Sequence, residues 1–207
     1  MTEFSMLGLA PALLAALERT GKDQPTPIQA RAIPALMEGR DLMGLAQTGT
    51  GKTLAFGLPI LHRLQGQGKP GPKSARALIL APTRELVQQI AEALAQLAQG
   101  LPTSIVTVVG GASINRQMDR LVRGCDVLVA TPGRLIDLLE RSAVSLAKVQ
   151  MLVLDEADQM LDLGFIHALR KIARHLPKER QTMLFSATMP KDMSEIAETY
   201  LDRPVRV

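Results

Sequence analysis

The sequence predicts an α/β fold in which an open parallel β-sheet carries helices on both faces. Short apolar runs alternate with longer helical patterns along the 207 residues. Some runs, such as Leu78-Ile79-Leu80, are continuously apolar, as expected of parallel strands that are covered on both sides. Alternating strands and helices form right-handed βαβ units, and ligands of such sheets bind outside the carboxyl ends of the strands.

The expected elements follow from these patterns in chain order. An amphipathic first helix is expected within residues 6–17, and a last strand within residues 201–207, approached through a turn. The Gly-, Pro- and Lys-rich segment 65–74 is predicted to be a flexible surface loop. The strands between these ends are predicted at residues 41–45, 75–80, 105–109, 126–130, 149–154 and 182–185. The helices are predicted at residues 52–64, 84–98, 115–123, 134–140, 165–175 and 191–200.

Composition restricts the classes of protein that the chain can belong to. Hydrophobic residues make up 46% but aromatic residues only 2%, so the core must be aliphatic and few bases could stack on exposed rings. A net charge of +4 suits a polyanionic partner without requiring one. The single cysteine, Cys125, excludes an internal disulfide and is expected to be a buried bystander. No apolar run is long enough to span a bilayer, so we expect a cytoplasmic protein.

A phosphate-binding loop is predicted between the first strand and the helix that follows it. Its glycines, Gly49 and Gly51, let successive backbone N–H groups face an anion, and the helix start adds a positive end. Lys52 is expected at the surface of a cleft, where it can reach the β- and γ-phosphates of ATP. The general pattern begins with Gly, and Ala46 departs from it. The predicted loop consists of Ala46, Gln47, Thr48, Gly49, Thr50, Gly51, Lys52 and Thr53.

Two adjacent carboxylates follow another apolar strand. Asp155 is predicted to hold Mg²⁺ through water together with the Thr53 hydroxyl, because Mg²⁺ loses its own water reluctantly. Glu156 is predicted to orient and activate the attacking water. An acidic helix N-cap is the ordinary alternative for such a pair, and the upstream phosphate loop favours the functional interpretation.

Asp155-Glu156-Ala157-Asp158 spells the name of the DEAD-box RNA helicases, and the chain resembles that family along nearly its whole length. The resemblance implies a RecA-like fold, with an N-terminal helix and adenine-recognition segment at residues 1–30 and an ATP-binding domain at 31–207. It implies RNA-dependent ATP hydrolysis coupled to local duplex unwinding. The family's second helicase domain has no match here and is expected to be absent from this chain, which we expect to be monomeric.

Adenine recognition is implied for the segment Pro25-Thr26-Pro27-Ile28-Gln29. The Gln29 amide has both a donor and an acceptor and can pair with the adenine edge. Its ordinary alternative is a solvated side chain at a helix start. The family usually has an aromatic residue after the glycine that corresponds to Gly21, and here that residue is Lys22, whose alkyl stem covers a base less well. Phe4 is expected to brace this segment.

RNA contacts are implied for three further motifs, which are expected to hold one strand by its sugar-phosphate backbone without reading bases. Arg84 and Arg134 follow predicted strands at helix starts, where guanidinium groups bind phosphates well, although surface salt bridges are the commoner fate of a single arginine. The implied RNA-binding residues are Pro82, Thr83, Arg84, Gly110, Gly111, Thr131, Pro132, Gly133 and Arg134.

Asp158 and the motif Ser186-Ala187-Thr188 are expected to hydrogen-bond to each other and to couple the hydrolysis site to the RNA side. Two competing interpretations remain open at this point. A small-molecule kinase would explain Lys52 and Asp155 but neither Gln29 nor the residues around Arg134. A nucleotide-gated RNA-binding module without catalysis would not need Glu156.

Overall fold

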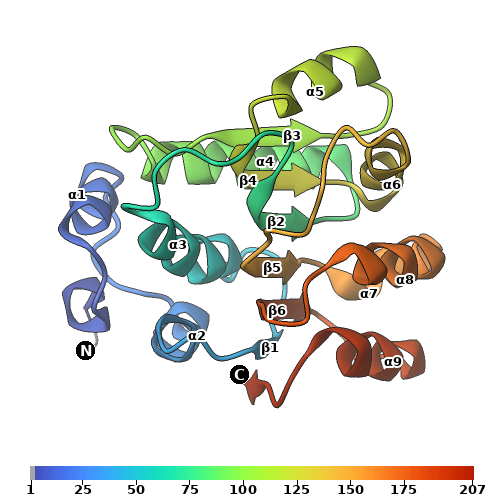
Figure 1. Cartoon of the computed structure of the whole chain (residues 1–207). Coiled ribbons are helices and arrows are strands. Elements are labelled where there is room, and N and C mark those ends of the chain that lie inside the picture. Colours follow the sequence, from blue (N-terminus) through green and yellow to red (C-terminus); the bar gives the residue numbers. More distant parts are fainter. Residues whose placement is uncertain (1–2) are drawn as a thin grey trace.

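Parallel strands form one sheet in the order β3-β4-β2-β5-β6-β1-β7 (Figure 1). The computed structural model describes residues 3–207 of the chain. Every strand pair in the sheet is parallel, which confirms the predicted fold class. The strands are β1 (Leu42–Leu45), β2 (Ala75–Leu80), β3 (Ile105–Val108), β4 (Cys125–Ala130), β5 (Met151–Leu154), β6 (Gln181–Ser186) and β7 (Val205–Arg206).

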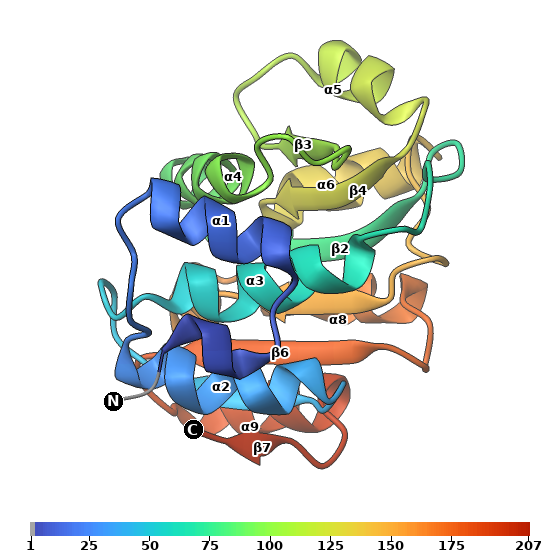
Figure 2. The same ribbon diagram turned by 90° about the vertical axis from the view of Figure 1, so that its left-hand side faces the viewer.

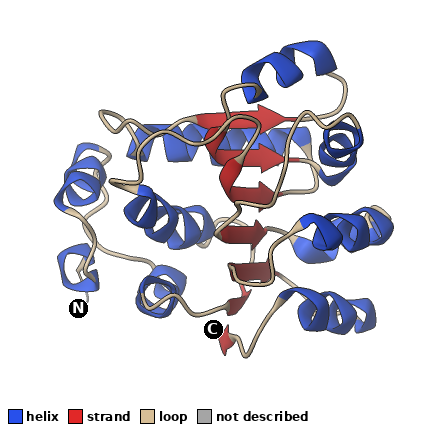
Figure 3. Ribbon diagram, viewed as in Figure 1, coloured by secondary structure: helices blue, strands red, loops and turns tan. Residues whose placement is uncertain are grey.

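Helices cover both faces of the sheet, in the three layers that Figures 1 and 3 show. One face carries α1 (Pro11–Arg19), α2 (Pro27–Met37), α3 (Lys52–Leu64) and α4 (Arg84–Leu97). The other carries α5 (Ile114–Leu121), α6 (Pro132–Glu140), α7 (Ala157–Asp162), α8 (Ile166–His175) and α9 (Lys191–Tyr200).

The core is accordingly split into two aliphatic layers, one on each side of the sheet. Successive residues of β2 alternate between them: Ala77 and Ile79 pack against α1–α4, and Leu78 and Leu80 pack against α5–α9. All four are fully buried. This explains why the strand sequence is continuously apolar instead of alternating. The six internal strands and six helices lie within about two residues of their predicted bounds.

The prediction of one amphipathic helix within residues 6–17 is wrong. A 3₁₀ helix, η1 (Phe4–Leu7), is followed by Gly8 in the left-handed conformation, and α1 begins only at Pro11. Glycine adopts positive φ without steric cost, and proline, which lacks an N–H, suits the first turn of a helix. The break lets the buried Phe4 ring and α1 pack separately onto the domain, as Figure 2 shows for the two segments.

Two helices, α2 and α7, are absent from the predicted set, although a helix start at Gln29 is that residue's ordinary alternative. Proline at position 34 lies inside α2 and obscured its helical pattern, although Thr26 and Gln29 form a capping box that marks its start. The short α7 directly follows the carboxylate motif. α2 runs through residue 30 and contributes Ile28 and Ile33 to the same core layer as α1 and α3.

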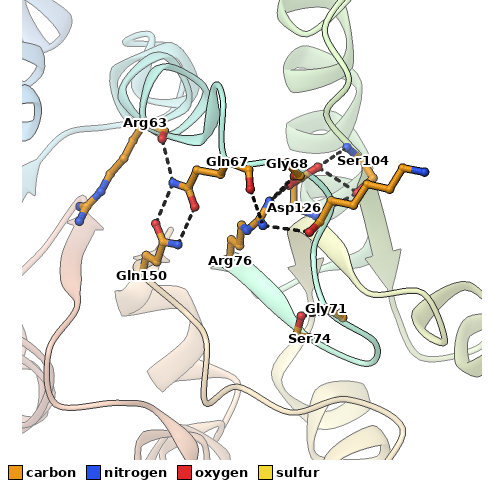
Figure 4. Close-up of polar contacts among 10 residues, drawn as sticks. Arg63, Gln67, Gly68, Gly71, Ser74, Arg76, Ser104, Asp126 and Gln150 are labelled. Carbon is orange, nitrogen blue, oxygen red and sulfur yellow. Dashed lines mark hydrogen bonds and ion pairs between the residues drawn. The ribbon is translucent and has the colours of Figure 1, made fainter.

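The loop at residues 65–74 lies at the surface, and side chains hold it in place (Figure 4). The Arg76 guanidinium donates to the carbonyls of Gly68 and Gln67 and pairs with Asp126 at 3.0 Å. The Gln67 amide exchanges hydrogen bonds with Gln150. The amino ends of β2, β4 and β5 are thereby tied together, far from the carboxyl ends where ligands of such sheets bind.

None of the helices in residues 3–207 combines the length and the apolar run that a bilayer crossing requires.

Candidate functional site

The predicted motifs divide the carboxyl edge of the sheet between two halves. The ends of β1, β6 and β5 carry the phosphate loop, the 186–188 motif and the carboxylate motif. The ends of β2, β4 and β3 carry the motifs at 82–84, 131–134 and 110–111. Because the strand order is β3-β4-β2-β5-β6-β1, the predicted ATP motifs lie together and the predicted RNA motifs lie beside them.

The phosphate loop leaves the start of α3 open to an anion. Lys52 is the first helical residue, and Gly51 before it has a left-handed conformation without a side-chain cap. The first N–H groups of the helix therefore lack a capping side chain, and the helix dipole adds a partial positive charge there. Within the loop, the Thr50 hydroxyl donates to the Gln47 carbonyl at 2.7 Å, and the buried Ala46 N–H donates to the Ser186 carbonyl. Such an end is suited to phosphate oxygens.

Residues 25–29, the segment predicted to recognise adenine, are hydrogen-bonded to this loop. The Gln29 Nε2 donates to the Gly51 carbonyl at 3.0 Å, and the Thr26 hydroxyl donates to the Thr50 carbonyl at 2.9 Å. A Cβ at Gly51 would lie 2.5 Å from that Nε2, and its φ is +89°, so only glycine fits there. Two loop carbonyls thus accept hydrogen bonds from the segment at residues 25–29. Thr26 was not predicted to have this role, although its spacing from Gln29 signals a capping box.

Gln29 is not a solvated side chain, since it is only 4% exposed. Its Oε1 accepts from the Thr26 N–H at 2.9 Å, and its Nε2 uses one hydrogen for Gly51. One N–H and one lone pair of the amide are left, which is the pair of groups that the adenine edge requires.

Lys52, Asp155 and Glu156 form a charged cluster beside the loop. The Lys52 Nζ lies 3.2 Å from Asp155 Oδ1 and 3.9 Å from Glu156 Oε1. Lys52 is 7% exposed and Asp155 only 2%, so Lys52 lies deeper than the cleft surface that was expected. Burial raises the pKa of the Asp155 carboxyl, and the Lys52 ammonium opposes this shift. When it is ionised, the Asp155 carboxylate stabilises the positive charge of the neighbouring Lys52 ammonium.

Glu156 has a left-handed backbone conformation, with φ 51° and ψ 51°, at the start of α7. This conformation is unusual for a residue with a side chain and is concentrated at functional sites. The Glu156 carboxylate is partly exposed and accepts from the Thr48 hydroxyl at 3.3 Å. It therefore faces the phosphate loop across the ends of the strands, where a carboxylate can orient a water molecule.

Two cavities meet at Lys22. One, of about 500 Å³, lies between Lys22, the phosphate loop and the Asp155–Glu156 pair, and extends along α4. The other, of about 440 Å³, is lined by Lys22, Phe4 and Gln29. Phe4 is 3% exposed and lines this second cavity. A larger cavity, of about 1050 Å³, lies at the opposite edge of the sheet and includes none of the predicted site residues.

The residues fit Mg²⁺ only together with bound phosphates. Among residues 3–207, no group of three or more His, Cys, Asp or Glu side chains could hold a metal ion. Mg²⁺ is commonly held by one or two carboxylates, waters and substrate phosphates, so this sparse donor set suits it. Asp155 and the Thr53 hydroxyl, in the first turn of α3, are the protein groups available beside the loop.

Asp158 contacts the 186–188 motif through Thr188, whereas the expected bond with the Ser186 hydroxyl is replaced by one within the motif. Its carboxylate accepts from the Thr188 hydroxyl at 2.9 Å and from the Thr188 N–H at 3.1 Å. The buried Ser186 hydroxyl donates to the Thr188 carbonyl, and Ala187 between them is exposed. Partial burial alone would raise the pKa of Asp158, but the hydrogen bonds from Thr188 and the Gln159 N–H lower it overall.

The arginines of the other half differ in orientation. Arg84, the first residue of α4, is exposed, and its Nη1 lies 2.8 Å from the position a Cβ would take on Gly111. Arg134 is mostly buried, and its Nη1 donates to the Ala112 carbonyl at 2.9 Å. The structure therefore presents the Arg84 guanidinium at the surface and turns that of Arg134 inward.

The remaining residues of this half lie around these two arginines. The Thr83 hydroxyl caps α4 by accepting from the Leu86 N–H. Gly111 and Gly133 are exposed, Gly110 is half-buried, and Pro82, Thr131 and Pro132 are buried.

Comparison with known proteins gives one consistent family. A family model described as DEAD/DEAH box helicase matches residues 26–196. The chain is 44% identical over 204 residues to the ATP-dependent RNA helicase CshA of Listeria monocytogenes, covering 99% of the chain and 38% of that protein. It is 44% identical to the DEAD-box ATP-dependent RNA helicase CshA of Geobacillus kaustophilus, covering 99% and 43%. It is 46% identical to the RNA helicase CrhR of Synechocystis, covering 99% and 40%. The chain thus spans about two fifths of the length of these relatives.

Proposed function

The chain belongs to the DEAD/DEAH box helicase family, and on that premise we propose that it is the ATP-binding domain of an ATP-dependent RNA helicase. Its proposed reaction is RNA-dependent hydrolysis of ATP to ADP and phosphate, coupled to local unwinding of RNA duplexes. The observation that carries the proposal is the cluster of Lys52, Asp155 and Glu156 at the open start of α3.

In the proposed site the chain binds ATP mainly by positioning its phosphates. The N–H groups of residues 46–53 surround the β- and γ-phosphates, and Lys52 leaves Asp155 to neutralise them. Asp155 and Thr53 hold Mg²⁺, which supplies additional positive charge at the phosphates. Glu156 orients the attacking water and accepts its proton. Gln29 pairs with the adenine edge through its remaining N–H and lone pair, and Lys22 covers the base.

RNA is proposed to bind across the other half of the same edge, through its sugar-phosphate backbone. Arg84 and the backbone around Gly111 and Thr131 provide donors for phosphate and 2′-hydroxyl groups, and the low aromatic content gives no base-stacking platform. Asp158 and Thr188 connect this half with the hydrolysis site.

We also propose that a second domain completes both sites. The curated relatives are longer than the chain, which leaves room in them for such a domain. Residues 1–30 and 31–207 would then act as the adenine-recognition segment and the ATP-binding domain of one monomeric half. The cytoplasm, where RNA and ATP occur together, is the proposed site of action.

Phosphate release measured with and without RNA tests this proposal. Residues 1–207 alone should bind ADP but hydrolyse ATP very slowly, because an arginine supplied from outside a domain is commonly worth ~10³-fold or more in phosphoryl transfer. The longer protein that contains this chain should show RNA-stimulated turnover. Robust RNA-stimulated hydrolysis by residues 1–207 alone would contradict the two-domain part, and absence of ADP binding would contradict the whole proposal.

A further inference from the structure

Helix α5 presents a row of arginines that none of the predicted motifs includes. Arg116, Arg120 and Arg123, the last in the turn after the helix, are spaced by four and three residues and are all exposed. Residues with this spacing lie on one side of a helix. The opposite side of α5 carries Gln117 and Leu121, which are buried. The row is therefore a continuous cationic strip on the outside of the domain.

The charge of this strip is not compensated within the structure. Across the described residues, the guanidinium groups of Arg116, Arg120 and Arg123 form no ion pair and no hydrogen bond. By contrast, Arg170 pairs with Glu195, and Arg76 pairs with Asp126. From residue 110 to residue 124 the sequence has three arginines and one acidic residue, Asp119. Three arginines on one side with one carboxylate leave a strong local positive charge, which suits a polyanion.

The strip starts at the RNA half of the carboxyl edge and leads away from it. α5 begins three residues after Gly111, beside the exposed Arg84, and then returns toward the amino end of β4. Figures 1 and 2 both show α5 beyond β3, the strand at that edge of the sheet. Each helical turn advances by about 5.4 Å, so the three arginines are spaced along this edge at intervals of about one turn. An extended ligand could contact them one after another.

A polar network fixes the helix to the strand ends. The Arg134 Nη1 donates to Gln117 Oε1 at 3.1 Å and to the Ala112 carbonyl, and the Gln117 Nε2 donates to the Val109 carbonyl at 3.0 Å. Gln117 is 5% exposed, so its bond to the Val109 carbonyl is shielded from water, whereas the Arg134–Ala112 bond lies at the surface. The strip is consequently held in a fixed orientation relative to Gly111 and Arg84. The inward orientation of Arg134 allows its guanidinium group to make these two hydrogen bonds.

We propose that Arg116, Arg120 and Arg123 bind the phosphate backbone of RNA that continues beyond the carboxyl edge of the sheet, and so extend the RNA site over the β3 edge. The inference rests on the proposed RNA binding and adds a second contact region to it. Guanidinium groups bind phosphate bidentately, and the strip follows closely in the chain on Gly111, which lies against Arg84. An acidic protein is the less suitable partner: on α5 and its following turn, as described, the one exposed large apolar residue is Val122, and protein interfaces have apolar centres.

The test compares the whole chain with a variant carrying Arg116→Gln, Arg120→Gln and Arg123→Gln. The matched control carries Lys171→Gln, Arg174→Gln and Lys178→Gln, which removes the same charge from exposed positions within α8 and shortly after it. Binding is measured by fluorescence anisotropy with single-stranded RNAs of about six and about twenty nucleotides, of which the first lies near the lower end of the usual site sizes and the second exceeds them.

The strip variant should bind the short RNA within about twofold of wild type and the long RNA at least tenfold more weakly. The slope of log affinity against log salt for the long RNA should fall by about 2, since each lost phosphate contact on a single strand contributes about 0.7. In the control variant, the affinity for the long RNA and its salt slope should both change less than they do in the strip variant. Thermal unfolding of both variants confirms that they remain folded.

The possible outcomes separate the two proposals. If wild type binds the short RNA and the strip variant keeps the full affinity and salt slope for the long RNA, the strip proposal fails alone. If the control loses as much affinity as the strip variant, the effect is one of net charge and the strip proposal also fails. If wild type binds neither RNA at low salt, the proposed RNA binding fails as well.

Discussion

The Lys52 ammonium lies 3.2 Å from the Asp155 carboxylate, and both side chains are almost completely buried. Lys52→Ala should therefore do more than weaken ADP binding. It should also lower the free energy of unfolding at pH 7, by up to about 3–5 kcal/mol, because it leaves a buried carboxylate without its partner. Calorimetric titration with ADP and chemical denaturation measure the two effects. Unchanged ADP affinity in a folded variant would refute the phosphate-loop assignment.

The pH dependence of that loss identifies its cause. Burial raises the pKa of Asp155 in the folded protein, and removal of Lys52 removes an opposing influence, so the pKa rises further. A carboxyl with a raised folded pKa stabilises the protein at low pH and loses this contribution as pH rises through that pKa. The loss of unfolding free energy in Lys52→Ala, relative to wild type, should thus become smaller from pH 7 toward pH 4. The double variant Lys52→Ala/Asp155→Asn should regain stability at pH 7 without regaining ADP affinity.

Glu156→Gln should preserve nucleotide binding and abolish turnover in the longer protein. Gln occupies the same volume and can still accept a hydrogen bond from Thr48, but it does not take a proton at neutral pH. Loss of a general base typically costs ~10²-fold or more. Single-turnover hydrolysis and ADP titration are the measurements. A rate within about threefold of wild type, well short of that ~10²-fold loss, would show that Glu156 is not the base.

Sequence patterns predicted the sheet, because parallel strands buried on both faces produce continuous apolar runs that hardly depend on context. They failed where local signals conflict with tertiary structure. Gly8 and Pro11 divide the first helix into two segments, and Pro34 is accommodated inside α2. Both errors concern elements whose helical conformation is stabilised by packing against α3 and not by propensity alone.

The candidate site was predictable in composition but not in its internal bonding. The order of motifs placed Lys52, Asp155 and Glu156 at strand ends, and the structure brings them together. The inward direction of Arg134 could not be predicted, because it depends on Gln117, whose burial follows from how α5 packs. The motif predicts the position of the Arg134 backbone at the start of α6, whereas the direction of its side chain depends on Gln117, which lies elsewhere in the sequence.

Thr188→Ala should raise the pKa of Asp158. In the folded protein the Thr188 hydroxyl and N–H lower that pKa, so Asp158 contributes stability above its unfolded value of about 3.9 and loses it as pH falls through the folded pKa. Titration of the Asp158 carboxyl by NMR measures the change. Thr188→Ser keeps a hydroxyl and should keep the lowered pKa. An unchanged pKa in Thr188→Ala would show that the hydroxyl contributes nothing to it.

Cys125 should be inert toward thiol reagents in the native protein. It is fully buried in β4, and burial, together with the neighbouring Asp126 carboxylate, raises the pKa of the thiol to about 12. At pH 8 only about one molecule in ten thousand would carry the reactive thiolate, even if the reagent could reach it. Cys125 should react with an aromatic disulfide reagent only after denaturant is added. In the control Ser194→Cys, the exposed thiol on α9 should react at once. Rapid reaction of native wild type would contradict the burial.

Lys22 lines both cavities of the candidate nucleotide site, and its replacement separates holding the base from recognising it. Stacking needs a flat face and is nearly indifferent to which base is offered. Lys22→Phe should therefore tighten ADP binding by about 0.5–1.5 kcal/mol and change the ratio of ADP to GDP affinity little. Titration with both nucleotides gives the result. Unchanged or weaker ADP binding would mean that Lys22 does not face the base and that Phe4 or another residue covers it.

Gln29→Ala should instead collapse the ratio of ADP to GDP affinity, since a hydrogen-bonding amide distinguishes the two base edges. Gln29 also donates to the Gly51 carbonyl, so its loss could act through the position of the phosphate loop. Thr26→Val is the matched control, because it removes the other hydrogen bond to the loop, from Thr26 to the Thr50 carbonyl, and leaves the Gln29 amide in place. If the ratio collapses only in Gln29→Ala, the amide reads the base. If Thr26→Val collapses it equally, discrimination comes from the loop, and if neither does, Gln29 does not recognise adenine.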